Sequence, residues 1–168
     1  MSVTDDVIEN LAAVGDLPIL TSLHEAGKLD GYRLDVITRM AAECGHIHLL
    51  EWISKIITCY PERLMHWGNI LPAGVTLCAV NTVTASTVST LNYLFVNHRE
   101  YLDWSIDEYS GLFSGNNTAG SIQSVLEWMR SVDLPLSLSA YQKKVMKYRP
   151  ELIHWYERNC PELAIQIV

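Results

Sequence analysis

Three residues of one short segment, Cys44, His46 and His48, carry the side chains that most often bind zinc in proteins. A thiolate and two imidazoles would supply three ligands, but no fourth ligand lies nearby in the sequence. Alternate positions on either side of a turn at Gly45 do not have to converge on one ion. We therefore expect no metal site here: His46 should support the turn by hydrogen bonding, and His48 should face solvent.

Other titratable residues could take part in acid–base chemistry, because imidazole titrates near neutral pH. They are His24, His66, His98 and His154, with the acidic group Asp103, Asp107 and Glu108. None lies in a nucleophile elbow, a phosphate-binding loop, a dinucleotide-binding glycine motif or a zinc-protease motif. The acidic group is interpreted as a solvated face. The sequence thus predicts a protein without catalytic activity and without a cofactor.

Composition sets the class of protein. The chain has 168 residues, 49% of them hydrophobic and 18% charged, which is typical of one globular domain. Its 19 acidic and 12 basic residues give a net charge of -7, which argues against general binding to nucleic acid or anionic lipid. It has no apolar stretch of membrane-spanning length and no paired cysteine motif. We expect a protein of the cytoplasm or nucleus, with no membrane partner.

Five segments repeat one pattern of aliphatic residues. The segment 45–53 aligns without gaps to 15–23, and related patterns recur at 89–94, 120–129 and 150–156. One equivalent position is held in turn by Ser22, Trp52, Tyr93, Trp128 and Trp155, at intervals of 27 to 41 residues. Such intervals are typical of solenoids built from helix pairs. The three tryptophans of this position are predicted to pack between neighbouring pairs.

A second helical pattern precedes each copy and opens on a residue able to cap a helix. A side-chain oxygen at this position accepts a hydrogen bond from the first helical turn, which stabilises the helix by about 1 kcal/mol. The predicted caps are Thr4, Asp35, Thr76, Ser105, and Ser137 or Ser139. Within the pairs, turns are predicted at Gly15, Gly45 and Gly120, because glycine adopts a left-handed backbone at little cost.

The segment 41–53, Ala-Ala-Glu-Cys-Gly-His-Ile-His-Leu-Leu-Glu-Trp-Ile, resembles a divergent ankyrin repeat, and the segment 12–17 is similar to the same motif. The resemblance is clearest at residues 8–57 and weaker at 104–158. The Thr-Pro-Leu-His opening of the standard repeat is absent, which argues against regular β-hairpin fingers. The resemblance implies an intracellular scaffold that binds protein partners on the concave surface of its turns and first helices, without catalysis or a cofactor.

These patterns predict an all-α fold, an ankyrin-like solenoid of about five stacked helix pairs. A single pair cannot bury its apolar face, so neighbouring pairs must share one core. The single repeat domain would contain units near 3–31, 32–72, 73–102, 103–134 and 135–168. The predicted function is that of a protein-interaction scaffold. The alternative is an enzyme, or a protein binding a small ligand or metal, with a pocket lined by Cys44, His46, His48 and His66.

Six residues are predicted to contact the partner, because they occupy turns or first helices. Aromatic side chains exposed at such positions dominate binding energy when a partner removes them from water. The predicted contacts are Trp67, Trp104, Tyr32, Arg33, Tyr101 and Tyr109.

Charge is unevenly distributed near the end of the chain. Four basic residues crowd into seven positions, with two tyrosines beside them: Lys143, Lys144, Lys147 and Arg149, with Tyr141 and Tyr148. This group could contact phosphate or an acidic peptide, or it could form a solvated helix face. The apolar segment 162–168 could support self-association.

Overall fold

A computed structural model describes residues 4–59, 83–99, 111–113 and 115–164 of the chain. Within these ranges every regular element is a helix and there is no strand, so the all-α prediction is confirmed. The helices are α1 (Asp5–Val14), α2 (Leu17–Glu25), α3 (Gly31–Cys44), α4 (Ile47–Cys59), α7 (Thr87–His98), α8 (Ala119–Ser131), α9 (Ala140–Met146), α10 (Pro150–Asn159) and α11 (Pro161–Ala164).

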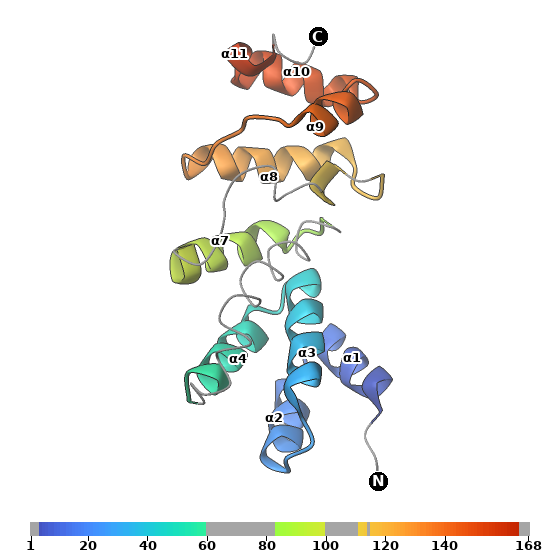
Figure 1. Cartoon of the computed structure of the whole chain (residues 1–168), viewed down its shortest axis with the longest axis vertical. Helices are drawn as coiled ribbons and strands as arrows, with labels where there is room; N and C mark the ends of the chain where they lie inside the picture. The colour runs from blue at the N-terminus through green and yellow to red at the C-terminus, as the bar shows by residue number, and fades with distance from the viewer. Residues whose placement is uncertain (1–3, 60–82, 100–110, 114, 165–168) are drawn as a thin grey trace.

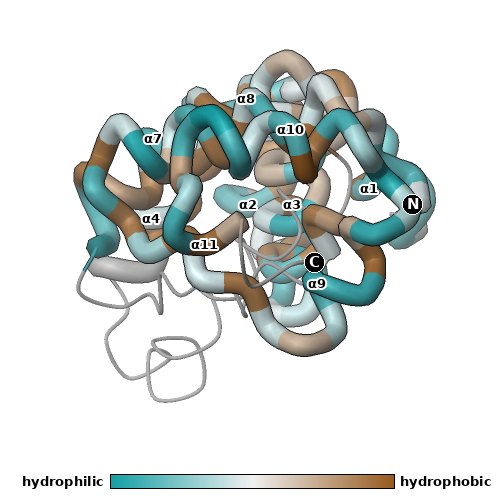
Figure 2. Tube along the Cα trace, turned by 90° about the horizontal axis from the view of Figure 1, so that it is seen from above, coloured by the Kyte–Doolittle hydropathy of each residue, from teal (hydrophilic) through white to brown (hydrophobic). Residues whose placement is uncertain are grey.

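The helices follow one another along the long axis of an elongated molecule (Figure 1). α1 packs against α3 and α3 against α4, while α4, α7, α8 and α10 each contact the next in this order. Seen along the axis, α1 and α9 lie towards one side of the molecule and α4 and α7 towards the other (Figure 2). None of the helices in the described ranges has the length and apolar character needed to cross a membrane.

One apolar core runs through the described residues, from Ile8 at one end to Ala164 at the other. The tryptophans of the repeated position contribute to it as predicted. Trp128 and Trp155 are buried, and Trp52 is partly buried against the core. Two of them meet the second helix of the preceding pair edge to face: Trp52 contacts His24 of α2, with ring centroids 5.9 Å apart, and Trp128 contacts Phe95 of α7 at 6.0 Å. The indole N–H of Trp155 lies 3.4 Å from a carboxylate oxygen of Glu127 of α8.

Two of the three predicted glycine turns are confirmed. Gly15 and Gly45 both have a φ of 77°, a left-handed conformation that ends α1 and α3. The prediction for Gly120 is wrong, because this residue lies inside α8. The helix begins earlier than expected, since the side chain of Thr118 accepts a hydrogen bond from the backbone N–H of Ser121 at 3.1 Å.

The predicted caps have mixed outcomes. Ser139 caps α9 and forms a reciprocal capping box with Gln142. The prediction for Asp35 is wrong, because the side chain of Asp30 accepts from the N–H of Arg33 and starts α3 at Gly31. Thr4 precedes α1 without a side-chain capping bond. Ser137 lies before α9 without capping it, and Thr76 and Ser105 lie outside the described residues.

Tyr156 is the largest fully buried side chain of the described core, and its hydroxyl donates to the backbone oxygen of Leu136 at 3.3 Å. Burial, with a smaller contribution from Cys160, raises the pKa of Tyr156 well above its ordinary value of 10.0. A folded-state pKa above the unfolded one stabilises the fold fully below the unfolded pKa, and this contribution is lost as pH rises beyond it.

We therefore expect the free energy of unfolding to fall as pH rises above about 10. The Tyr156→Phe variant should be less stable at neutral pH, because it lacks the hydroxyl bond, but its stability should fall less steeply in alkali. Urea unfolding at a series of pH values, followed by circular dichroism, measures both effects. Parallel alkaline losses in the two proteins would contradict this assignment.

Candidate partner-binding surface

Two of the six predicted partner contacts, Tyr32 and Arg33, lie in the described part of the chain. They were expected in a turn, but the structure places both in the first turn of α3, because Asp30 caps the helix before them. The Tyr32 side chain is 63% exposed and free to contact a partner. The other four, Trp67, Tyr101, Trp104 and Tyr109, lie outside the described residues.

Arg33 supports the loop beside Tyr32. Its Nε lies 3.0 Å from a carboxylate oxygen of Asp5 on α1, and its Nη1 donates to the backbone oxygen of Lys28 at 2.9 Å. The guanidinium therefore ties the loop between α2 and α3 to the first helix of the molecule. Arg33 positions this loop, and Tyr32 is the member of the pair that presents an open surface.

A depression of about 530 Å³ lies where α2 ends and α3 begins. Nδ1 of His24 is buried here without a hydrogen-bond partner among the described residues. The buried side chain of Leu29 anchors the loop, while charged groups surround the opening. The depression is lined by His24, Gly27, Lys28, Leu29, Asp30, Gly31 and Arg33. The exposed Tyr32 lies next to this lining in the sequence.

His46 and His48, the two histidines near Cys44, bind backbone oxygens of the preceding turn. Nε2 of His46 lies 2.8 Å from the oxygen of Ala13, and Nε2 of His48 lies 3.0 Å from that of Gly15. A carbonyl oxygen accepts but does not donate, so each ring carries a hydrogen on Nε2. His46 supports a turn by hydrogen bonding, but this turn belongs to the preceding pair and is not the one at Gly45, so the prediction is right only in part. His48 is exposed as expected, but it is also hydrogen bonded.

The surroundings of Cys44 bear on the alternative prediction, in which these residues line a metal site or a ligand pocket. Burial, together with the nearby charge of Glu43, raises the pKa of the Cys44 thiol, so the neutral thiol is favoured in the metal-free protein. Within the described ranges no three potential ligands converge on one point. His66, the fourth residue proposed for a pocket, lies outside these ranges.

Close contacts join the turns at Gly15 and Gly45 to the elements that follow them along the molecule. A β-carbon on Gly15 would lie 2.9 Å from the ring of His46, and one on Gly45 would overlap the side chain of Ser86. The turns therefore approach so closely that only glycine fits at these two places. We expect this close approach to help set the spacing of the helix pairs along one edge.

Asn117 also links neighbouring units, and no sequence pattern singled it out, because residues 115–118 have the composition of a loop. Its side chain is buried, accepts from the N–H of Val83 at 2.8 Å, and donates to the oxygen of Leu112 at 3.0 Å. Its backbone oxygen accepts from Nη1 of Arg149 at 2.7 Å. One residue thus links segments of three successive predicted units. A loop composition alone gives no signal that one of its residues is buried.

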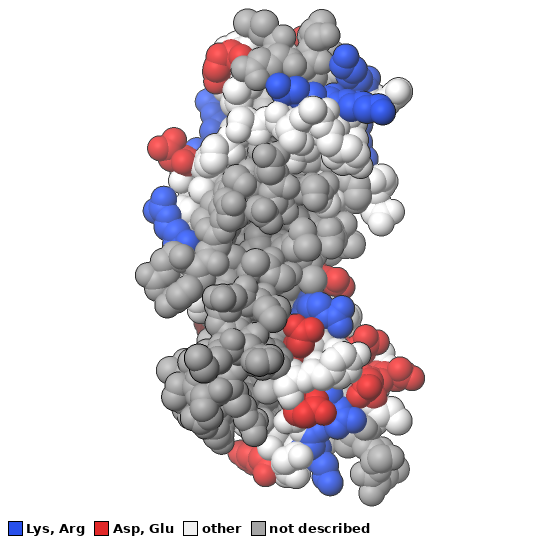
Figure 3. Space-filling model, in the orientation of Figure 1, with Lys and Arg blue, Asp and Glu red and all other residues white. Residues whose placement is uncertain are grey.

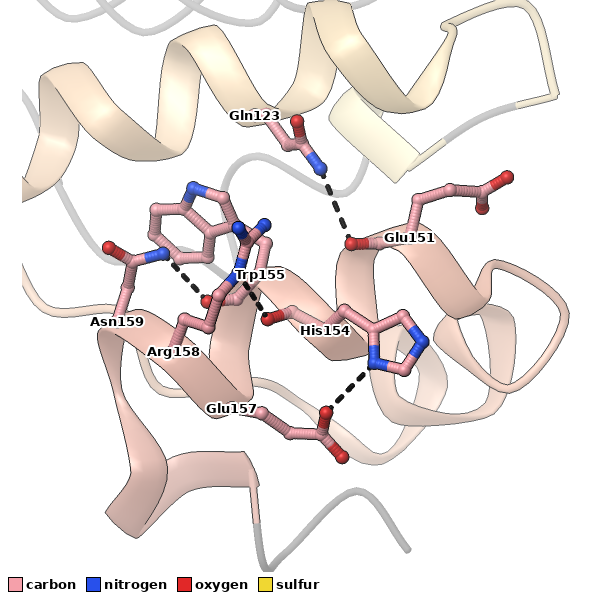
Figure 4. A network of polar contacts seen from close by, with 7 residues as sticks. All are labelled: Gln123, Glu151, His154, Trp155, Glu157, Arg158 and Asn159. Carbon is pink, nitrogen blue, oxygen red and sulfur yellow. Dashed lines mark hydrogen bonds and ion pairs between the residues drawn. The ribbon is translucent and has the colours of Figure 1, made fainter.

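Further polar contacts join α8 to α10. Nε2 of Gln123 donates to the backbone oxygen of Glu151 at 3.3 Å (Figure 4), and Nη1 of Arg130 donates to Asn159 at 2.7 Å. The bonded residues are 28 and 29 positions apart, and the pair formed by His46 and Ala13 is 33 apart. These separations fall within the interval of 27 to 41 residues that the sequence pattern predicts for the repeat.

Comparisons with a collection of family models, with curated proteins and with solved structures found no match to this chain. The likeness of residues 8–57 to an ankyrin repeat stays a prediction from the sequence motif. Function must be inferred from the surfaces that the chain itself presents.

Proposed function

We propose that the chain is a non-catalytic protein-interaction scaffold, in which ankyrin-like helix pairs stack and bind a protein partner through their first helices and turns. The observation that supports this proposal is that the aromatic residues form a buried group and an exposed group. The tryptophans of the repeated position pack inside, whereas Tyr32 on α3 and Tyr141 on α9, both first helices of a pair, are each 63% exposed. Exposed tyrosines supply large contact areas at low entropic cost.

The contacts between turns support a rigid binding surface. The bonds of His46, Asn117 and Arg149 cross from one predicted pair to the next, and the Arg33 ion pair joins α1 to α3. A surface held in place before binding loses little conformational entropy, so a few anchors suffice for affinity. We place the protein in the cytoplasm or nucleus, in agreement with the free thiols of Cys44 and Cys160.

Photocrosslinking from position 32 tests the proposed surface. A benzoylphenylalanine replacing Tyr32, in cells that make the protein, should form adducts with a specific partner. The matched control replaces Val96, which is 70% exposed but lies on α7, a second helix. Adducts from both positions alike, or from neither, would contradict the proposal.

With a partner so identified, Tyr32→Ala should weaken binding by roughly tenfold, as expected for an aromatic contact. Because the side chain is mostly exposed, the circular dichroism spectrum and the melting temperature should stay as in the wild type. Titration calorimetry measures the affinity. Unchanged affinity in a folded variant would remove Tyr32 from the interface.

A further inference from the structure

Four neighbouring side chains near α9 face solvent: Tyr141, Lys144, Lys147 and Tyr148. Tyr141 and Tyr148 are 63% and 82% exposed, and both lysines are exposed as well. The N–H groups of Lys147 and Tyr148 bond to oxygens within α9, so the helical course continues to them. Positions i, i+3 and i+7 share one face of a helix, which places the two tyrosines and Lys144 in one stripe with Lys147 beside it. We call these four residues the α9 patch.

The α9 patch is firmly supported from behind. Gln142 and Met146, on the opposite side of the helix, are fully buried. The capping box between Ser139 and Gln142 fixes the start of α9, and the bond from Arg149 to Asn117 ties its end to the preceding pair. The exposed side chains therefore project from a backbone that is already ordered before anything binds.

The α9 patch is positive on a negative molecule. From position 134 to position 150 the chain has four basic residues and no acidic one, although its net charge is -7. In the part of the chain that the structure describes, neither Lys144 nor Lys147 has a carboxylate oxygen within ion-pair distance. Basic side chains gather at the upper end of the molecule, at the height of α9 and α10 (Figure 3). Two ammonium groups are thus available for an external anion.

We propose that the α9 patch docks a short segment rich in Asp and Glu on the protein partner. This inference rests on the proposed function and names the chemistry of the partner. The ammonium groups of Lys144 and Lys147 would attract carboxylates, while the rings of Tyr141 and Tyr148 supply apolar contact area and hydroxyl donors. The patch is about 10 Å long at the rise of a helix, so an extended segment of about four residues covers it.

A nucleic acid fits the α9 patch less well than an acidic peptide does. A phosphate backbone carries regular negative charge and continues beyond so short a patch. Towards the other end of the molecule it would meet an acidic surface, including Asp5, Asp6 and Glu9 of α1. A short acidic peptide contacts the patch alone and avoids this repulsion.

Fluorescence polarisation with a labelled peptide of about eight alternating Asp and Glu residues, twice the span of the patch, tests the inference on the full chain. An Asn and Gln peptide of equal length and a thymidine oligonucleotide serve as comparison probes. The acidic peptide should bind, more weakly as salt is added, and the uncharged one should not. The double variant K144Q/K147Q should weaken binding by about tenfold, the size expected for two exposed charge contacts.

The matched control is K55Q/R158Q, which removes the same net charge from exposed basic residues elsewhere and should change the affinity by less than about twofold. Tyr141→Ala/Tyr148→Ala should also weaken binding, because the rings form part of the contact. Equal losses in the two charge-removing double variants, tighter binding of the oligonucleotide, or no binding of the acidic peptide would overturn the inference.

The two proposals can fail separately. If position 32 crosslinks a partner but the acidic peptide does not bind, the inference about the α9 patch is wrong and the scaffold function stands. If the peptide binds as expected but position 32 yields no adduct, the patch stands and the proposed surface around Tyr32 is wrong.

Discussion

Replacing Asn117 with alanine is expected to lower the free energy of unfolding by about 2–4 kcal/mol. The side chain accepts from Val83 and donates to the oxygens of Leu112 and Gly111, at 2.8, 3.0 and 3.3 Å. Alanine removes all three bonds, so the backbone groups of Val83, Leu112 and Gly111 lose the hydrogen-bond partner that Asn117 provides. A buried polar group without a hydrogen bond costs about 1–3 kcal/mol, so the losses accumulate at this one position.

The matched control is Asn116→Ala, since Asn116 is the exposed neighbour in the same loop. It should change stability by less than about 0.5 kcal/mol. Asn117→Asp separates the two halves of the network, because a carboxylate still accepts from Val83 but cannot donate to Leu112. Its stability at neutral pH should lie below that of the wild type. Urea unfolding measured by circular dichroism compares all four proteins, and equal stability of the Asn116 and Asn117 variants would show that the network does not hold the units together.

Much of the helical framework was predictable, because it depends on neighbours in the sequence. The repeated aliphatic pattern predicted the helices around Trp52, Tyr93, Trp128 and Trp155, and all four lie in helices. The burial of the tryptophans followed from the same periodicity. The left-handed turn at Gly45 followed from the backbone freedom of glycine, together with its position between two helical patterns.

Choices between nearby residues of similar type were harder to predict. Asp30 and Asp35 both have a side chain able to cap a helix. The structure uses Asp30, because the residues that follow it continue the helix, whereas Asp35 forms an ion pair with Arg39 one turn further on, at 3.5 Å. This choice moves Tyr32 and Arg33 from a turn into a helix. Local propensities favour either residue, so contacts made after folding decide between them.

Contacts across the repeat could not be predicted from the sequence at all. His46 was expected to support its own turn, but it binds the turn that lies 33 residues earlier. Asn117 bonds to Val83 across 34 residues and to Arg149 across 32. The partner of such a side chain depends on how the helices stack, and the unequal intervals of the predicted repeats do not reveal that stacking.

Gly45→Ala is expected to destabilise the chain by about 3 kcal/mol or more, because two costs add at this position. The left-handed backbone, with a φ of 77°, costs about 1–2 kcal/mol for a residue with a side chain. A β-carbon would also overlap the side chain of Ser86, at the start of α7, and this overlap forces apart elements that pack closely. The turn between α3 and α4 would then lose its contact with the next helix.

Gly27→Ala isolates the backbone cost, because Gly27 has a φ of 65° but a β-carbon there would meet no atom within 4 Å. Gly27→Ala should therefore lower the free energy of unfolding by about 1–2 kcal/mol. Adding Ser86→Gly to Gly45→Ala removes the overlapping side chain. The free energy of unfolding of this double variant should lie below that of Ser86→Gly alone by no more than the decrease that Gly27→Ala causes in the wild type. Chemical unfolding of the five proteins gives these differences directly. If Gly45→Ala and Gly27→Ala are equally destabilising, or if Ser86→Gly rescues nothing, then the turns are not packed against each other and the spacing of the helix pairs must be set by their apolar cores alone.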